Sequence, residues 1–228
     1  MAAAIDSTPL SYADRRSQSG SGSYYLQLAD EFRRSGHAEP ALRYFARAVQ
    51  RNPELPAPWL GQVEMLLELS ELGQARTWAD KALEIHSDHP DLLAAKAVVC
   101  ARLGDTDQAL SLTHQAVQAS NASSFAWIAR GEALLAGERT GEDYCFTQAV
   151  TVAGEDWFVC SRIARVLCMY GEHTQALDRA GQAVARAPET PYAWHVLGEC
   201  ESALGMDSAA VGSFEKALRI DSSLEQAR

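Results

Sequence analysis

The chain has 228 residues, of which 47% are hydrophobic and 22% are charged, and this composition is typical of a folded globular protein. Its formal net charge of −10 at pH 7 disfavours nucleic acid as a partner, because an acidic surface repels phosphate groups. No stretch reaches the roughly 20 apolar residues of a membrane span, and the N-terminus has no apolar segment of a secretory signal. We therefore expect a cytoplasmic protein without a membrane span.

The chain begins with residues 1–21, which we expect to form a flexible tail because they lead into the Ser- and Gly-rich stretch 17–23. A regular repeat follows. One alanine recurs at spacings of 34, 34, 33, 34 and 34 residues, as Ala48, Ala82, Ala116, Ala149, Ala183 and Ala217. This spacing predicts six units, with one residue missing from the fourth: 22–55, 56–89, 90–123, 124–156, 157–190 and 191–224.

Each unit is predicted to contain two helices. Apolar residues recur at steps of three and four, as in Ala41, Phe45 and Ala48, which is the period of an amphipathic helix. Four glycines stand where a first helix should end in a left-handed turn, namely Gly36, Gly104, Gly171 and Gly205. No alternating apolar segment is bounded by hairpin turns, so the predicted fold class is all-α.

The residues that carry the period resemble the tetratricopeptide repeat. The last unit matches the pattern of that family best, with Trp194, Leu197, Gly198, Gly205, Ala210, Phe214 and Ala217. The resemblance implies a right-handed superhelical solenoid of antiparallel helix pairs, in which the first helices line a concave groove. It also implies a non-catalytic scaffold or adaptor that binds a protein or peptide ligand.

Within this family, fixed positions of the first helix face the ligand, and we read those positions from the sequence as a tentative groove. Acidic and basic residues share it: Asp30, Glu64, Glu132, Arg162, Arg165, His195 and Glu199. Three aromatic residues, Phe125, Phe158 and Tyr192, occupy the second position of units four to six. Aromatic side chains are typical anchors for a partner peptide, but they are equally typical of packing between neighbouring repeats. Both interpretations remain open at this point.

The sequence offers no catalytic, cofactor or metal site. Phosphate-binding, dinucleotide-binding, zinc-protease and hydrolase motifs are absent, so we expect no enzyme and no cofactor. His86, Asp88 and His89 are too few to hold a metal, which needs three or four convergent ligands. The five cysteines lie scattered in apolar helical patterns and are expected to be buried thiols: Cys100, Cys145, Cys160, Cys168 and Cys200.

Three functional alternatives follow from the resemblance. The first is an independent adaptor, the second is an interaction module of a larger enzyme or regulator, and the third is a helper or chaperone for secretion or pilus assembly. The carboxylate clamp of co-chaperone members is absent, since Glu64 or Glu132 stands where asparagine is required. Residues 225–228 read as the start of a truncated further helix, which favours the second alternative and leaves the last unit available for self-association.

Overall fold

The computed structural model describes residues 22–222, which form twelve α-helices and no strand. The predicted tail, residues 1–21, and the predicted truncated helix, residues 225–228, lie outside the described residues. The first helices of the six pairs are α2 (Gly22–Arg34), α4 (Pro56–Glu68), α6 (Pro90–Arg102), α8 (Ser124–Ala136), α10 (Trp157–Met169) and α12 (Pro191–Ala203). The second helices are α3 (Ala38–Arg51), α5 (Leu72–Ile85), α7 (Thr106–Val117), α9 (Glu142–Ala153), α11 (His173–Arg186) and α13 (Asp207–Ile220).

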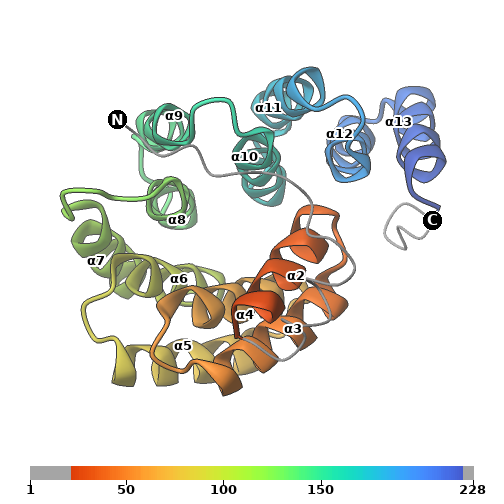
Figure 1. Cartoon of the computed structure of the whole chain (residues 1–228). Coiled ribbons are helices and arrows are strands. Elements are labelled where there is room, and N and C mark those ends of the chain that lie inside the picture. Colours follow the sequence, from red (N-terminus) through yellow and green to blue (C-terminus); the bar gives the residue numbers. More distant parts are fainter. Residues whose placement is uncertain (1–21, 223–228) are drawn as a thin grey trace, which may run out of the picture.

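The helix pairs stack into a curved solenoid. Figure 1 shows the helices from α4 to α11 in two layers, with the first helices on the inside of the curve and the second helices on the outside. Proline begins three of the first helices, at Pro56, Pro90 and Pro191. Its fixed φ suits the first turn of a helix, where the missing N–H costs no hydrogen bond. These three repeats therefore restart at a residue that favours a helix beginning.

The turn within each pair uses a left-handed residue. The four predicted glycines, Gly36, Gly104, Gly171 and Gly205, have φ of 85°, 87°, 85° and 71°, which confirms the prediction. Units two and four keep the left-handed turn without glycine, at Ser70 (φ 60°) and Glu138 (φ 51°). The fold thus holds two ordinary side chains in a conformation that glycine adopts at lower cost.

Small residues allow the close packing of the helices. A Cβ atom on Gly131 would lie 2.4 Å from the ring of Phe146, and one on Gly198 would lie 2.6 Å from Phe214. Glycine is therefore needed at these two positions, where the two helices of a unit approach each other. Gly61 makes the same contact between units, because its Cβ would lie 2.2 Å from Phe45.

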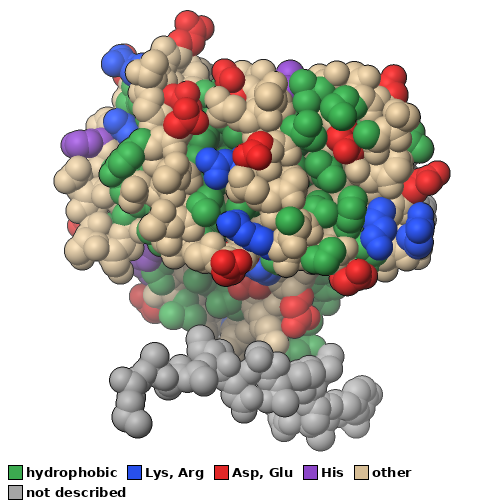
Figure 2. Space-filling view, turned by 90° about the horizontal axis from the view of Figure 1, so that it is seen from above, with side chains coloured by type: hydrophobic (Ala, Val, Ile, Leu, Met, Phe, Trp, Pro, Cys, Tyr) green, Lys and Arg blue, Asp and Glu red, His purple; other side chains and the backbone are tan. Residues whose placement is uncertain are grey.

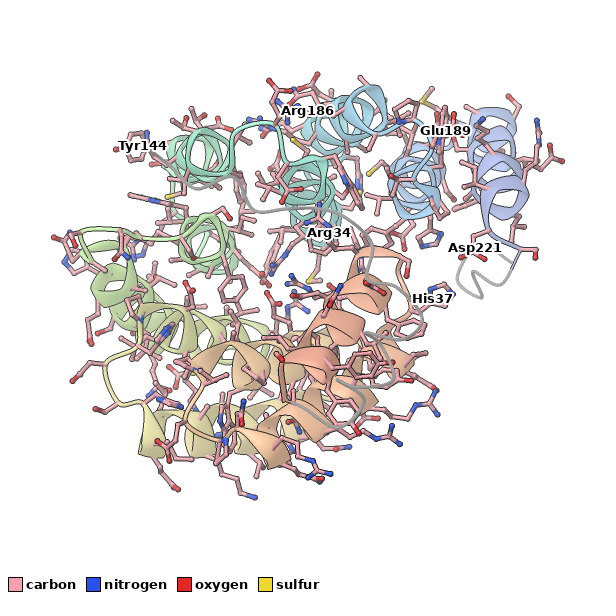
Figure 3. The ribbon with its side chains drawn as sticks, viewed as in Figure 1. Arg34, His37, Tyr144, Arg186, Glu189 and Asp221 are labelled. Carbon is pink, nitrogen blue, oxygen red and sulfur yellow. The ribbon has the colours of Figure 1, made fainter. Side chains whose placement is uncertain are left out.

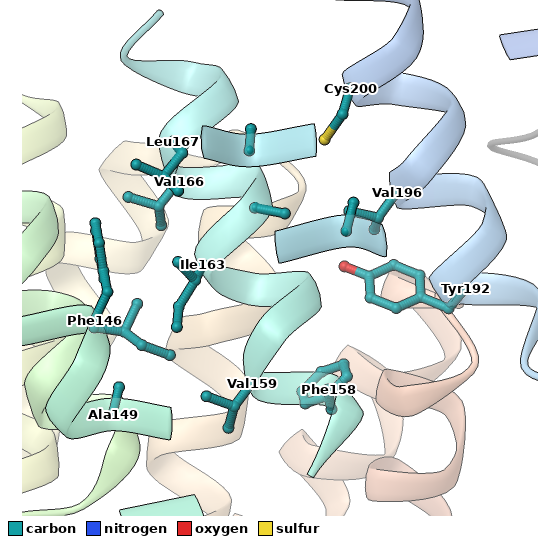
Figure 4. Packing of buried hydrophobic residues seen from close by; sticks show 14 residues of the cluster. Phe146, Ala149, Phe158, Val159, Ile163, Val166, Leu167, Tyr192, Val196 and Cys200 are labelled. Carbon is teal, nitrogen blue, oxygen red and sulfur yellow. The ribbon is translucent and has the colours of Figure 1, made fainter. Parts of the chain in front are cut away.

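Buried apolar side chains form clusters between the stacked helices. In the largest cluster, around α10, Ile163, Phe146 of α9 and Val196 of α12 are almost fully buried, with Phe146 and Val196 on opposite sides of α10 (Figure 4). Phe158 and Tyr192 close this cluster at the starts of α10 and α12. Each repeat therefore buries its apolar face against the next, as expected for a solenoid.

The surface carries charges of both signs. Basic and acidic side chains are interspersed over the face seen in Figure 2. Among the described residues, no helix is long and apolar enough to cross a membrane. Four of the cysteines are buried as predicted, whereas Cys168 is only partly buried and its Sγ lies 3.2 Å from the Sγ of Cys200.

Candidate partner-binding site

A cavity of about 110 Å³ lies on the inside of the curve, lined mainly by the first helices of units two to five and also by Arg33 of α2. Apolar side chains such as Val98 and Ile128 line part of it, and charged side chains line the rest. Met169, the last residue of α10, stands at the cavity with 52% of its surface exposed. The cavity therefore combines an apolar wall, paired charges and an accessible apolar side chain.

Glu64 lies at the centre of the charged part. Its carboxylate is 2.7 Å from Nη1 of Arg33 and 2.6 Å from Nη1 of Arg162, and only 5% of the side chain is exposed. Burial alone would raise the pKa of Glu64, but the guanidinium groups of Arg162 and Arg33 outweigh burial and hold that pKa below its ordinary value. Asp30 lies beside them, 3.0 Å from Nη2 of Arg33, and burial raises its pKa despite that ion pair. Glu64 thus ties α4 to both α2 and α10.

The aromatic residues proposed as groove anchors are buried. Phe125 is 7% exposed, Phe158 is 6% exposed and Tyr192 is 4% exposed. Arg162 covers the ring of Phe125, with its guanidinium carbon 4.7 Å from the ring centroid. Arg33 covers Phe158 at 5.2 Å. Aromatic packing between repeats therefore accounts for these rings, and arginines cover two of them on the inner side.

Arg165 organises a second charged group. It donates a hydrogen bond to the Tyr192 hydroxyl at 3.1 Å, forms an ion pair with Glu68 and lies 3.6 Å from Glu199. Glu199 also lies 3.4 Å from Nε2 of His195. Burial would raise the pKa of Glu199, but the hydrogen bond from His195 and the charge of Arg165 keep it below its ordinary value.

A third pair lies on α6 and α8. Arg102 donates from Nε to Glu132 at 2.7 Å and from Nη1 to the carbonyl oxygen of Leu67 at 3.2 Å. Glu132 is 2% exposed, so its charge is neutralised by Arg102 and not by water. Burial and the nearby Glu132 raise the pKa of Tyr170 to about 12. The predicted acidic positions are therefore largely paired within the protein.

Sequence reasoning missed the contact that closes the inner face. Arg34, the last residue of α2, forms a two-bond ion pair with Asp156, which lies directly before α10. Figure 3 shows Arg34 in the space between these two helices. Asp156 also caps α10 by accepting a hydrogen bond from the Phe158 amide at 3.0 Å. An Asp before a helix signals a cap, but nothing in the sequence pairs it with an arginine 122 residues away.

Within the part of the chain that the structure describes, metal ligands do not converge at this face. Among residues 22–222, no group of three or more His, Cys, Asp and Glu side chains is placed to hold a metal ion. His86, singled out in the sequence, instead contacts the carbonyl oxygen of Pro53 through Nε2 at 3.2 Å.

Comparison with curated proteins gives a partial match. Residues of this chain are 30% identical over 95 positions to cellulose synthase operon protein C of Pseudomonas fluorescens. The match covers 42% of this chain but only 7% of that much longer protein. Similarity is thus confined to one segment of that relative.

Comparison with solved structures shows the same fold in bacterial proteins. A thermophilic TPR protein of Thermus thermophilus is 21% identical, with a TM-score of 0.60, and the match covers 81% of this chain and 99% of that one. A tetratricopeptide repeat protein of Parabacteroides merdae is 16% identical, with a TM-score of 0.53 and coverage of 94% and 88%. A tetratricopeptide repeat model matches residues 26–90 and 171–225, which together make more than half of the chain. The chain belongs to the tetratricopeptide repeat family.

Proposed function

We propose that the chain is a non-catalytic scaffold that binds a peptide or helix of a partner protein on the inner face formed by α4, α6, α8 and α10. Its repeats are protein–protein interaction modules. The observation that carries the proposal is the cavity on this face, which combines apolar walls with Arg102, Arg162 and Arg165. Partner segments anchor best where apolar contact area adjoins oriented hydrogen-bond donors.

Met169 provides the accessible part of this site. Its flexible thioether side chain is half exposed and lines the cavity beside Arg165. Methionine adapts to differently shaped apolar partners, which makes it common at binding surfaces. By contrast, truncating Phe125 or Phe158 would disturb the core, because both rings are more than 90% buried. Met169 is therefore the better position for a test.

The experiment replaces Met169 with glutamate and captures partners from an extract of the cells that make the protein. We expect Met169→Glu to reduce partner recovery at least tenfold, because a charge is placed on the apolar wall of the site. The matched control is Val152→Glu on α9, since Val152 is 53% exposed but does not line the cavity. Helical content and the melting temperature should be the same in both variants.

Two outcomes would contradict the proposal. If both variants recover as much partner as the wild-type protein does, the partner does not use the inner face. A loss with Val152→Glu alone would place the contact on the outer helices.

A second candidate is an interaction module that works as part of a larger protein. It is favoured by the match to a short segment of a much longer relative whose name links it to cellulose synthesis. The same inner face would then serve a partner within that larger protein. The cytoplasmic location, the secretion or pilus alternative and self-association through α13 stay predictions.

A further inference from the structure

One part of the inner face binds an arginine side chain of the chain itself. Asp156 accepts two hydrogen bonds from Arg34, at 2.7 Å from Nη2 and 3.1 Å from Nη1. The guanidinium carbon of Arg34 lies 5.1 Å from the ring centroids of both Trp157 and Phe158. A two-pronged carboxylate contact over aromatic rings matches the flat, five-donor guanidinium and not the compact ammonium of lysine.

A second arginine position adjoins the first. Glu64 binds Arg33 at 2.7 Å, and Arg33 stacks on the same Phe158 ring at 5.2 Å. The two carboxylates, Glu64 and Asp156, therefore receive two consecutive arginines, with Phe158 between them. This arrangement is a site for an Arg-Arg pair, defined by Glu64, Asp156, Trp157 and Phe158.

The arginines of α2 are imperfect and separable ligands. Nε of Arg33 is buried without a hydrogen-bond partner among the described residues, so the internal pair leaves one donor unsatisfied. The Arg34–Asp156 pair remains 38% and 34% exposed, where water and salt weaken ion pairs. Moreover, α2 packs on α3 through Ala29 and the stacked rings of Phe32 and Tyr44. That packing does not involve either arginine contact.

We infer that Glu64, Asp156, Trp157 and Phe158 form a binding site for two adjacent arginines of a partner segment, and that Arg33 and Arg34 occupy this site as an internal ligand. The inference rests on the proposed function and adds the chemistry of the partner. An acidic protein of net charge −10 also attracts a basic segment at long range. The partner must displace the internal pair, whose tethering gives it an effective concentration of the order of millimolar.

The experiment measures binding of a fluorescein-labelled synthetic peptide that copies residues 24–36, by fluorescence anisotropy. The protein variant Arg33→Ala/Arg34→Ala empties both arginine positions, and Arg34→Ala alone empties the Asp156 position while keeping the Glu64 pairs. We expect both variants to bind the peptide at least tenfold more tightly than the wild-type protein does. Adding Asp156→Asn to either variant should weaken binding at least tenfold again.

The peptide itself supplies the matched control. A copy with both arginines replaced by alanine should not bind, and one with two lysines should bind at least tenfold more weakly than the Arg-Arg peptide. Binding of the alanine peptide as tightly as the Arg-Arg peptide would overturn the inference, since α2 would then be recognised through its apolar face. Failure of the folded Arg34→Ala variant to bind the Arg-Arg peptide more tightly than wild type would overturn it as well.

These results separate the inference from the proposed function. Tight binding of the Arg-Arg peptide, together with unchanged partner capture by Met169→Glu, would sustain the arginine site and reject the Met169 side of the cavity as the main contact. Loss of partner capture by Met169→Glu, together with no binding of the Arg-Arg peptide, would support the proposed function and reject the arginine site.

Discussion

At the residue scale, Glu64 is the carboxylate that connects three helices of the inner face. It is one buried carboxylate between two arginines from helices that are far apart in the sequence, Arg33 on α2 and Arg162 on α10. Removing one member of such a group leaves a buried charge without a partner. The resulting loss of stability is larger than the net stabilisation that the intact group provides. Glu64 is therefore predicted to be essential for the stability of the closed inner face.

We predict that Glu64→Gln lowers the free energy of unfolding by roughly 3 kcal/mol at pH 7, measured by urea denaturation. The folded-state pKa of Glu64 lies below its ordinary value of 4.5, so the stabilisation is present above that value and is lost as pH falls through the folded-state pKa. The difference between wild type and Glu64→Gln should accordingly shrink in acid. A difference that stays constant down to pH 3, or is absent at pH 7, would contradict the assignment.

The residue scale also shows where sequence reasoning succeeds and fails. The left-handed glycines were predictable because each stands at the end of a predicted first helix, and glycine adopts a positive φ at low cost. Glu64 and Glu132 were predicted as contacts for a ligand. In the structure, both form ion pairs with arginines of the same chain. Sequence spacing identifies a helix face, whereas it does not say which side chain of another repeat already occupies that face. The same limit applies to Cys168 and Cys200, whose contact joins different helices.

At the element scale, the approach of two helices depends on the absence of a methyl group. A Cβ atom on Gly131 of α8 would overlap the ring of Phe146 on α9, and Phe146 is only 1% exposed. The glycine itself was visible in the sequence, because Gly198 occupies the same position of the last unit. The particular ring that fills each space was not, since it comes from the second helix.

We predict that Gly131→Ala lowers the free energy of unfolding by about 1–3 kcal/mol, because the added carbon overlaps the Phe146 ring. Gly181→Ala is the matched control within α11, where an added Cβ meets no atom within 4 Å. That control should be more stable than wild type by roughly 0.5–1 kcal/mol, since alanine favours helix over glycine. Thermal or urea melting of the two variants gives the comparison, and a loss of stability in both would reject the packing explanation.

At the scale of the whole molecule, the curvature of the array brings α2 to α10. Each repeat adds a small rotation, and the sum over several repeats decides whether distant helices meet. The period predicted six units and their helix pairs, but it contains no information on that accumulated angle. The Arg34–Asp156 contact, and with it the closed side of the inner face, could therefore be found only in the structure.

The curvature also determines where a partner gains access. Helices α4, α6, α8 and α10 surround the cavity, and the second helices stand outside it (Figure 1). Met169 and Val152 have nearly equal exposure but lie on opposite layers, on α10 and α9 respectively. These two positions therefore distinguish an inner from an outer binding surface without disturbing the core.

The most direct measurement of the central claim is photo-crosslinking from these two positions in the otherwise unchanged protein. The photoreactive amino acid benzoylphenylalanine would replace either Met169 or Val152, and the captured partner would be analysed by mass spectrometry after irradiation. The inner-face account predicts a covalent adduct with the partner from position 169 and none from position 152. An adduct from position 152 with none from position 169 would contradict it.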